Sequence, residues 1–313
     1  MMEFKHIPVL LDECINALNI MSNGVYADLT VGGAGHSIEI AKRLDLKKGR
    51  LICFDRDEQA ILAAKQRLEI FDLNFNFIHD NFTNFNEHMN RLNIEKLNGA
   101  LIDLGVSSHQ LDTPERGFSF HADAPLDMRM NPRDGELSAY DVVNDYDEQR
   151  LVSILYSYGE EKYAKSIAKG IIRARAISPV GTTGQLAQII KSNVPLKVRR
   201  EKNPCRKTFQ AIRIEVNGEL SAISDAIPQV FERLAQGGRL AVLTFHSIED
   251  RLVKNLFKEF SKGCSCPPDF PICVCAKKPR GKLVSRKPIA PSENELSENA
   301  RSRSAKLRVI EVV

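Results

Sequence analysis

Hydrophobic residues in the first hundred positions alternate between short apolar runs and longer stretches with helical spacing. The apolar runs predict four buried strands, at residues 25–31, 50–55, 75–78 and 99–104. Between them lie predicted helices, one of which is preceded by the good N-cap residue Asp57 and has Ile61, Ala64 and Leu68 on one face. Because strands that alternate with helices are typical of parallel β-α-β units, the pattern predicts an α/β fold.

The alternation stops in the middle of the chain. Residues 111–207 show no convincing strand, and prolines separate helical patterns at residues 148–158, 161–175 and 184–193. The alternation then returns, with predicted helices at 209–217, 220–235 and 248–260, a turn at Gly237-Gly238, and strands at 239–244 and 306–313. We therefore predict a Rossmann-like sheet domain of residues 1–110 and 208–313, interrupted by an all-helical domain of residues 111–207.

Composition places the chain among ordinary globular proteins, with 43% hydrophobic and 27% charged residues among 313. No apolar run is long enough to cross a bilayer, and the first 21 residues lack the basic lead and the apolar centre of a signal peptide. We expect a cytoplasmic protein without a membrane partner. The seven cysteines then suggest reduced thiols or metal ligands rather than a disulfide framework.

The net charge of +4 is unevenly distributed. Residues 197–213 hold seven basic residues and one acid, and residues 277–308 hold ten basic residues and three acids, which gives +6 and +7 and leaves −9 for the rest. Two basic segments on an acidic body favour a polyanionic partner such as nucleic acid, because phosphate neutralisation releases counterions. The alternative is that both segments are solvated loops.

The glycine-rich run after the first predicted strand suggests a cofactor site. Residues 30–36 read T-V-G-G-A-G-H, and glycines there let the backbone pass close to a ligand. Asp55 ends the second strand, where a carboxylate can bind the ribose hydroxyls of a nucleoside, and Asp28 is placed to pair with an amino group. The run does not have the G-x-G-x-x-G spacing of dinucleotide-binding turns, which favours a cofactor with an amino-acid end and no phosphate.

Polar residues at the ends of the fourth and fifth strands suggest a reaction site. Asp103 ends the fourth strand and faces the same crevice as Asp55, since ligands bind at the carboxyl ends of parallel strands. An acceptor there could orient an exocyclic amine and take up its proton. His246, after the fifth strand, could bind a base or phosphate or shuttle a proton. The alternative for both residues is a purely structural role.

Seven longer motifs extend the picture over nearly the whole chain. They are D-L-T-V-G-G-A-G-H-S, D-R-D, L-I-D-L-G-V-S-S-x-Q-L-D, E-R-G-F-S-F, P-L-D-M-R-M, R-K-T-F-Q-A-I-R-I-E-V-N and T-F-H-S-I-E-D-R. Together they resemble the bacterial 16S ribosomal RNA cytosine-N4 methyltransferases, the RsmH or MraW family. The resemblance implies a class I methyltransferase sheet with a helical insertion that recognises the substrate. It also implies S-adenosyl-L-methionine as cofactor and methylation of a decoding-region cytidine in the small ribosomal subunit.

Matching these motifs residue by residue implies a set of site residues. The cofactor contacts would be Ala34, Gly35, His36, Asp55, Phe82, Asp103 and Gln110. Asp103, Ser107 and His246 are the candidate catalytic residues. The S-P-P-Y type motif of DNA amino-methyltransferases is absent, so we expect no DNA substrate. The function class that competes with the enzyme is a non-catalytic RNA-binding ribosome assembly factor.

Four cysteines form a cluster within residues 264–275. Cys264, Cys266, Cys273 and Cys275 could hold tetrahedral zinc, although their C-x-C pairs differ from the usual C-x-x-C. The alternative is a reduced, mobile loop without metal.

Overall fold

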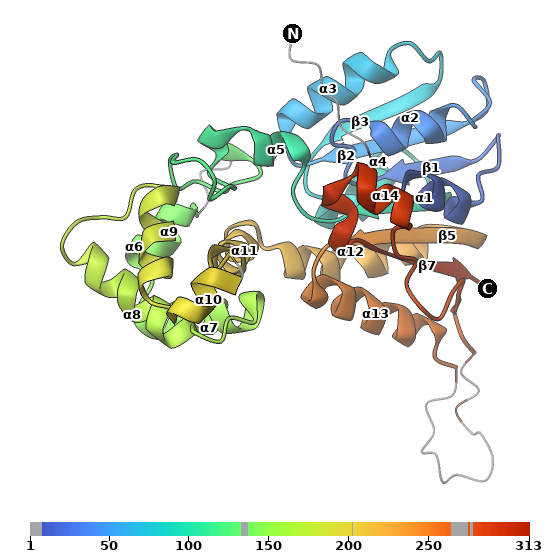
Figure 1. Cartoon of the computed structure of the whole chain (residues 1–313). Helices are drawn as coiled ribbons and strands as arrows, with labels where there is room; N and C mark the ends of the chain where they lie inside the picture. The colour runs from blue at the N-terminus through green and yellow to red at the C-terminus, as the bar shows by residue number, and fades with distance from the viewer. Residues whose placement is uncertain (1–7, 133–136, 202, 264–274, 276–277) are drawn as a thin grey trace. The chain divides into compact units, whose positions relative to one another are not determined.

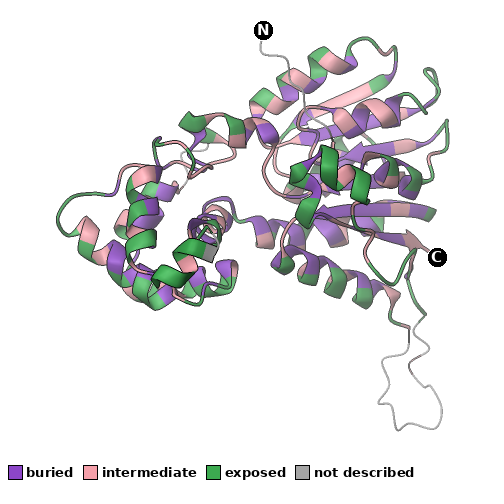
Figure 2. Cartoon of the chain, viewed as in Figure 1, coloured by how far each residue is buried: buried purple, intermediate pink, exposed green. Residues whose placement is uncertain are grey.

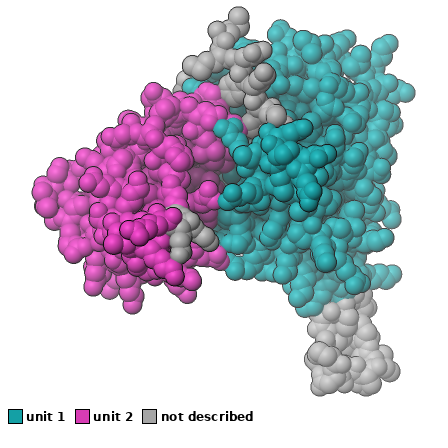
Figure 3. Space-filling view, in the orientation of Figure 1, with its two compact units in different colours: residues 1–105, 220–313 teal, residues 106–219 magenta. Residues whose placement is uncertain are grey.

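The computed structural model describes residues 8–132, 137–201, 203–263, 275 and 278–313. The chain divides into two compact units, shown in Figure 3: unit 1 comprises Met1–Gly105 and Leu220–Val313, and unit 2 comprises Val106–Glu219. The sequence analysis placed these boundaries after residues 110 and 207 instead. The second boundary differs because α11 (Cys205–Asn217) buries Phe209 and Ile212 in the core of unit 2.

Unit 1 contains a seven-stranded sheet with the order β3-β2-β1-β4-β5-β7-β6 (Figure 1). Its strands are β1 (Val25–Asp28), β2 (Arg50–Asp55), β3 (Asn74–His79), β4 (Leu97–Asp103), β5 (Leu234–Thr244), β6 (Gly281–Leu283) and β7 (Lys306–Val312). The first five strands run parallel, and β7 is antiparallel to both β5 and β6. This confirms the predicted α/β sheet, with helices inserted between β4 and β5.

Helices cover both faces of this sheet, so its strands are buried on both sides (Figure 2). Leu51 and Cys53 of β2 join one core cluster, whereas Ile52 and Phe54 join the other. The first cluster includes residues of α1 (Leu11–Leu18), α2 (Gly35–Ala41) and α3 (Glu58–Leu68), and the second includes residues of α4 (Phe85–Arg91), α12 (Glu219–Arg233) and α13 (Ser247–Ser261). Burial on both faces explains why β2 reads as an uninterrupted apolar run.

The sequence pattern did not reveal four elements of unit 1. These are α1, α4, the three-residue β6 and the helix α14 (Glu293–Glu298). Gly237-Gly238, predicted as a turn between helix and strand, lies within β5, where the register against β4 shifts between Leu97 and Gly99. Gly237 has φ +76°, which glycine adopts readily, so this pair forms an irregularity within the strand.

Unit 2 is built around the helices that replace the strand pattern. They are α5 (Ser108–Asp112), α6 (Ala139–Asp145), α7 (Glu148–Gly159), α8 (Ala164–Arg175), α9 (Thr183–Ser192), α10 (Leu196–Glu201) and α11. Asp147 caps α7 by accepting the Arg150 N–H, and Thr182 forms a capping box with Gln185 at the start of α9. Among the helices described, none is long and apolar enough to cross a membrane.

Candidate active site

Three carboxylates end neighbouring parallel strands of unit 1. β1 lies between β2 and β4 and is paired in register with both, so that Asp28 stands opposite Cys53 on one side and Leu101 on the other. Asp55 and Asp103 each follow these partners by two residues. All three aspartates therefore lie at the carboxyl edge of the sheet, where ligands bind in such folds.

The glycine-rich loop lies between two of these carboxylates and is held by both. Asp28 is 1% exposed and accepts hydrogen bonds from the Thr30 N–H (3.2 Å) and from the Ser37 hydroxyl (2.7 Å). On the other side, Asp55 Oδ2 accepts the Gly32 N–H at 2.8 Å. Asp28, predicted from the sequence to pair with an amino group, thus binds the chain itself, with one carboxylate oxygen on the loop and the other on Ser37 of the helix that follows it.

Backbone conformation in this loop requires unusual residues. Gly32 has φ +47° and Ala34 has φ +60°, both in the left-handed region that favours glycine. Gly35 begins α2, and a Cβ placed on it would lie 2.2 Å from Cγ of Pro8. Arg67 of α3 donates a hydrogen bond to the Gly33 carbonyl. The loop is therefore fixed in shape by contacts on both sides.

Asp103 has the most unusual environment of the three aspartates. Its N–H donates to the Thr30 hydroxyl at 2.6 Å, which ties the end of β4 to the loop after β1. Its side chain is 22% exposed, but its Oδ1 atom is buried and has no hydrogen-bond partner among the described residues. Burial, together with the negative charges of Asp28 and Glu249, raises the pKa of Asp103 to about 8. Such an acceptor is suited to a cationic or hydrogen-bond-donating ligand.

The other two carboxyl groups are also shifted towards their neutral forms. Burial raises the pKa of Asp28 to about 6, although hydrogen bonds from Ser37 and Thr30 oppose this. Burial raises the pKa of Asp55 to about 7, against hydrogen bonds from the N–H groups of Asp57 and Gly32. Acids crowded into one buried region mark a functional site, because a bound cation would stabilise their charged forms.

His36 lies beside Asp103. It is the second residue of α2, is 6% exposed, and has its Nδ1 atom 3.8 Å from Oδ2 of Asp103. Its Nε2 atom is 3.1 Å from the carbonyl oxygen of Val9. The structure thus brings together Ala34, Gly35, His36, Asp55 and Asp103 of the predicted cofactor set, all in the loop or at the adjoining strand ends.

His246 is the N-cap of α13, a structural role. Its Nδ1 atom accepts the Glu249 N–H (3.3 Å), and Oε2 of Glu249 accepts the N–H groups of Phe245 (2.8 Å) and His246 (3.2 Å), which completes a capping box. The carboxylate of Glu249 is buried and its charge contributes to the raised pKa of Asp103. The sequence analysis did not select Glu249, nor Thr30. The capping-box spacing after the fifth strand was the signal for Glu249.

The remaining predicted site residues belong to other elements of the chain. Phe82 begins a short 3₁₀ helix (Phe82–Asn84) after β3 and packs against a core cluster of unit 1. Ser107 and Gln110 belong to unit 2, where they form the capping box of α5. The Gln110 side chain accepts the Ser107 N–H at 3.0 Å, and the Ser107 hydroxyl accepts the Gln110 N–H at 3.2 Å.

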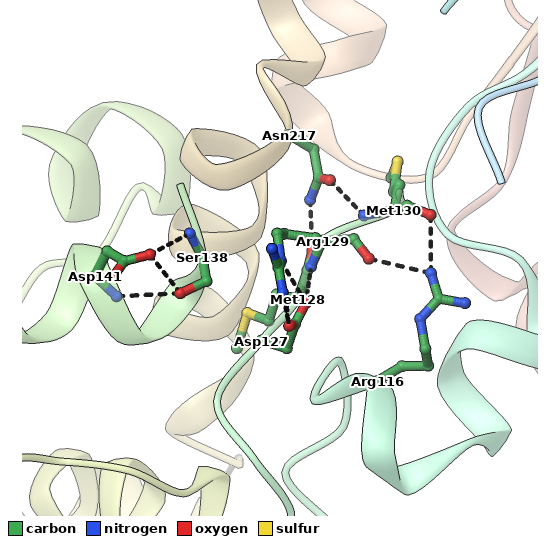
Figure 4. A network of polar contacts seen from close by, with 8 residues as sticks. All are labelled: Arg116, Asp127, Met128, Arg129, Met130, Ser138, Asp141 and Asn217. Atoms are coloured by element: carbon green, nitrogen blue, oxygen red, sulfur yellow. Dashed lines mark hydrogen bonds and ion pairs between the residues drawn. The ribbon is translucent and has the colours of Figure 1, made fainter. Parts of the chain in front are cut away.

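The P-L-D-M-R-M motif forms a clamped segment in unit 2 (Figure 4). Met128 is fully buried with φ +60°, a strained conformation for a long side chain. Asn217 of α11 fixes it by donating to the Met128 carbonyl (2.8 Å) and accepting the Met130 N–H (2.8 Å). Arg116 donates to the carbonyls of Arg129 and Met130, which follow the strained residue. Two motifs distant in sequence thus hold this segment, as expected where strain serves a site.

Several residues of the predicted basic segments are neutralised by carboxylates. Arg213 makes two hydrogen bonds, of 2.7 and 2.8 Å, to the buried Glu219. Lys306 and Arg308 of β7 both pair with Asp250, at 3.0 and 2.7 Å. The charge counts along the sequence therefore overestimated the positive charge that these segments can offer to a partner.

The zinc prediction falls largely outside the described residues, because Cys264, Cys266 and Cys273 are not among them. Cys275 is described, and it is half-buried and not in a disulfide. Within the described part of the chain, no group of three or more His, Cys, Asp or Glu residues is arranged to hold a metal ion.

Comparisons with known proteins show which family this chain resembles. The model of the MraW methylase family matches residues 3–313. The "Ribosomal RNA small subunit methyltransferase H" of Clostridium botulinum (strain Kyoto / Type A2) is 54% identical over 308 residues, which cover 98% of this chain and 99% of that protein. The protein of the same name from Clostridioides difficile (strain 630) is 52% identical over 313 residues, the whole of both chains.

A solved methyltransferase from Streptococcus mutans, in complex with SAH, has a TM-score of 0.45 and 13% identity, covering 98% of this chain and 100% of that one. That likeness is too distant for residues of its site to be transferred. The family model and the full-length relatives decide the assignment, and the chain belongs to the MraW methylase family.

Proposed function

We propose that this chain transfers a methyl group from S-adenosyl-L-methionine to the N4 amine of a cytidine in the decoding region of 16S ribosomal RNA. Support for the substrate comes from relatives 52–54% identical over their full length, which are named methyltransferases of small-subunit ribosomal RNA. The observation that carries the proposal is the group of buried carboxylates around the glycine-rich loop, with one Asp103 oxygen that no described residue hydrogen-bonds.

The residues at this edge of the sheet fit the cofactor. S-adenosylmethionine supplies an electrophilic methyl group on a positively charged sulfonium, attached to a nucleoside and an amino-acid end. Asp103 offers a buried, unpartnered acceptor in a negative environment, which suits a cationic group. Asp55 already accepts one N–H on each oxygen, but carboxylate oxygens have further lone pairs for ribose hydroxyls. The proposed contacts are Ala34, Gly35, His36, Asp55, Phe82, Asp103 and Gln110.

Asp103 is also the proposed catalytic residue. The N4 amine of cytosine is a poor nucleophile because its lone pair is delocalised into the ring. An acceptor that binds its protons orients the nitrogen for attack, and the nitrogen then gains a methyl group and loses one proton. With a pKa of about 8, the Asp103 carboxyl group is largely neutral at pH 7 on its own. A cationic sulfonium bound beside it would favour its charged form, and the carboxylate could then take that proton.

Ser107 and His246 have less direct parts in the proposal. The Ser107 hydroxyl accepts one hydrogen bond and can donate another, which suits contact with a base. His246 is engaged in capping α13, so its proposed part is to hold Glu249 and the end of β5 in place. Because the target atom lies within a base, the RNA must present that base turned out of its stack.

The test compares methyl transfer by Asp103→Asn with that by wild type and by Asp72→Asn, a matched change at an exposed aspartate of unit 1. Small ribosomal subunits from cells that lack the methyltransferase are incubated with S-adenosylmethionine labelled in its methyl group. We expect incorporation into RNA by wild type and Asp72→Asn, and a loss of at least about 100-fold for Asp103→Asn. Unchanged activity of Asp103→Asn would remove this residue from the mechanism.

The same measurement addresses the competing function class. A non-catalytic ribosome assembly factor would bind the subunits without incorporation of label by the wild-type protein. We further propose that the enzyme acts in the cytoplasm on assembled small subunits rather than on DNA. The zinc site at Cys264, Cys266, Cys273 and Cys275 stays a prediction, and elemental analysis of the purified protein decides it: one zinc per chain supports it, and none contradicts it.

A further inference from the structure

Unit 2 contains a stretch of 39 residues, 162–200, without an acidic residue. Nine basic residues lie within it: Lys162, Lys165, Lys169, Arg173, Arg175, Lys191, Lys197, Arg199 and Arg200. The whole chain has 44 basic and 40 acidic residues, so a stretch with +9 and no acid is far from its average. The stretch is fully described, and it spans α8, α9 and nearly all of α10.

Helix α8 sorts its residues into a buried and a basic side. Ile167 and Ile171 are fully buried in the core of unit 2. Lys165, Lys169 and Arg173 are exposed and follow each other at intervals of four residues, which places them on one side of the helix. Among the described residues no ion pair engages Lys165 or Lys169. No described carboxylate therefore neutralises these two lysines through an ion pair.

The basic side of α8 continues onto α10 through the end of α9. A Cβ placed on Gly170 of α8 would lie 2.2 Å from Nδ2 of Asn193, so the Asn193 side chain packs directly against the backbone of α8. Arg173 donates a hydrogen bond to the Asn193 side chain at 2.9 Å. The next residue, Val194, accepts a hydrogen bond through its carbonyl oxygen from Nε of Arg199, at 3.1 Å. The guanidinium groups of Arg173 and Arg199 are thus held at Asn193 and Val194, two adjacent residues that follow α9.

From this arrangement we infer that the basic face of α8 and α10 docks on the phosphate backbone of RNA, as a contact additional to the methylated base. The basic face consists of Lys162, Lys165, Lys169, Arg173, Lys191, Arg199 and Arg200, all exposed. Repulsion between these like charges raises the free energy of the isolated protein. Binding to a polyanion relieves the repulsion and releases the counterions that surround the polyanion. The choice of RNA among polyanions rests on the proposed function.

The experiment compares two pairs of exposed lysines, each four residues apart on a helix. Lys165→Gln/Lys169→Gln removes two charges from the basic face, and Lys254→Gln/Lys258→Gln removes two from α13 in unit 1. Dissociation constants for unmethylated small ribosomal subunits are measured at several KCl concentrations. We expect the first pair to weaken binding about tenfold near physiological salt and to lower the slope of log K against log salt by about 2, with little change for the second pair.

Equal affinities and salt slopes for the two pairs would overturn the inference. A second variant, Lys162→Gln/Arg200→Gln, tests the same face at other residues and should weaken binding similarly; no loss of affinity in it contradicts the inference. Binding to phosphatidylglycerol vesicles is measured as a comparison. If the lysine substitutions weaken binding to the vesicles but not to the ribosomal subunits, the partner of the basic face is a membrane instead.

The docking inference and the proposed function can fail separately. Incorporation of label by wild type, with full subunit affinity in the Lys165→Gln/Lys169→Gln variant, keeps the enzyme and rejects the docking face. Weakened binding in that variant, without incorporation by wild type, keeps the docking face and rejects the enzyme.

Discussion

Nδ1 of His36 lies 3.8 Å from Oδ2 of Asp103, while Nε2 of the same ring lies 3.1 Å from the carbonyl oxygen of Val9. A carbonyl oxygen only accepts hydrogen bonds, so Nε2 carries the hydrogen in the neutral ring, and Nδ1 is the ring nitrogen on the side of Asp103. The contact with the backbone of Val9 therefore holds the imidazole ring beside the carboxyl group of Asp103.

The raised pKa of Asp103 predicts a pH-dependent effect on stability. Its pKa is about 8 in the folded chain, against 3.8 for an ordinary aspartate. The folded state then binds more protons than the unfolded state between these values, so the free energy of unfolding falls as pH rises through this window. We expect Asp103→Asn, without cofactor, to melt about 3–6 °C above wild type at pH 9, with a much smaller difference at pH 5.

Differential scanning calorimetry at the two pH values measures this effect. Asp72→Asn, at an exposed position, should melt like wild type at both. A melting temperature of Asp103→Asn below that of wild type at pH 9 would show that the buried carboxylate does not destabilise the folded chain.

Opposite substitutions in the glycine-rich loop should have opposite effects. Gly32 and Ala34 both adopt left-handed backbone conformations, with φ of +47° and +60°. Ala34→Gly relieves a strained alanine and is expected to leave stability unchanged or raise it by up to about 1 kcal/mol. Gly32→Ala introduces the same strain and disturbs the hydrogen bond to Asp55, so we expect a loss of about 1–2 kcal/mol. Urea unfolding of both variants provides the comparison, and destabilisation of similar size in both contradicts the strain argument.

The cap formed by His246 predicts which substitutions are tolerated. Its Nδ1 atom accepts the Glu249 N–H, and asparagine can supply an equivalent acceptor at an N-cap. We expect His246→Asn to keep stability within about 0.5 kcal/mol and most of the methyl transfer, and His246→Leu to lose about 1 kcal/mol. Urea unfolding and the labelled-methyl assay together decide the role. A fully folded His246→Asn variant without activity would instead make His246 a catalytic residue.

Asn217 should be important for unit 2. It donates to the carbonyls of Met128 and Arg213 and accepts the Met130 N–H, and it is 5% exposed. Replacement by alanine leaves buried backbone groups without this partner and frees the strained Met128, for which we expect a loss of about 2–3 kcal/mol. Asn255→Ala, on an exposed helical position of α13, should change stability by less than about 0.5 kcal/mol.

Hydrogen exchange measured by mass spectrometry locates the effect of Asn217→Ala. Faster exchange in residues 126–130 is expected, whereas unchanged protection there would indicate that the segment is held by other contacts.

Much of unit 1 was predictable because its strands are buried on both faces. The apolar runs around Ile52 and Leu101 marked β2 and β4, and the aspartates that end them marked the crevice. The three-residue β6 carries too little pattern of its own, since it is a strand only through pairing with β7.

The candidate site was predictable at the level of residues but not of contacts. The spacing of His246 and Glu249 did not reveal which of them caps the helix, because that depends on the ring's orientation. Charge counts likewise missed the pairing of Arg213 with Glu219, which forms only when the chain folds back after α11. They also missed Lys165, Lys169 and Arg173 of α8, which lie outside the two segments that the counts selected.

The position of β7 between β5 and β6 has a consequence for how the chain is made. Residues 306–312 fill an internal place in the sheet, so unit 1 cannot complete its hydrogen bonding until they have left the ribosome. Unit 2 is assembled entirely from residues 106–219 and can form during translation, well before then. Nascent chains are therefore expected to carry a finished helical unit next to an unfinished sheet.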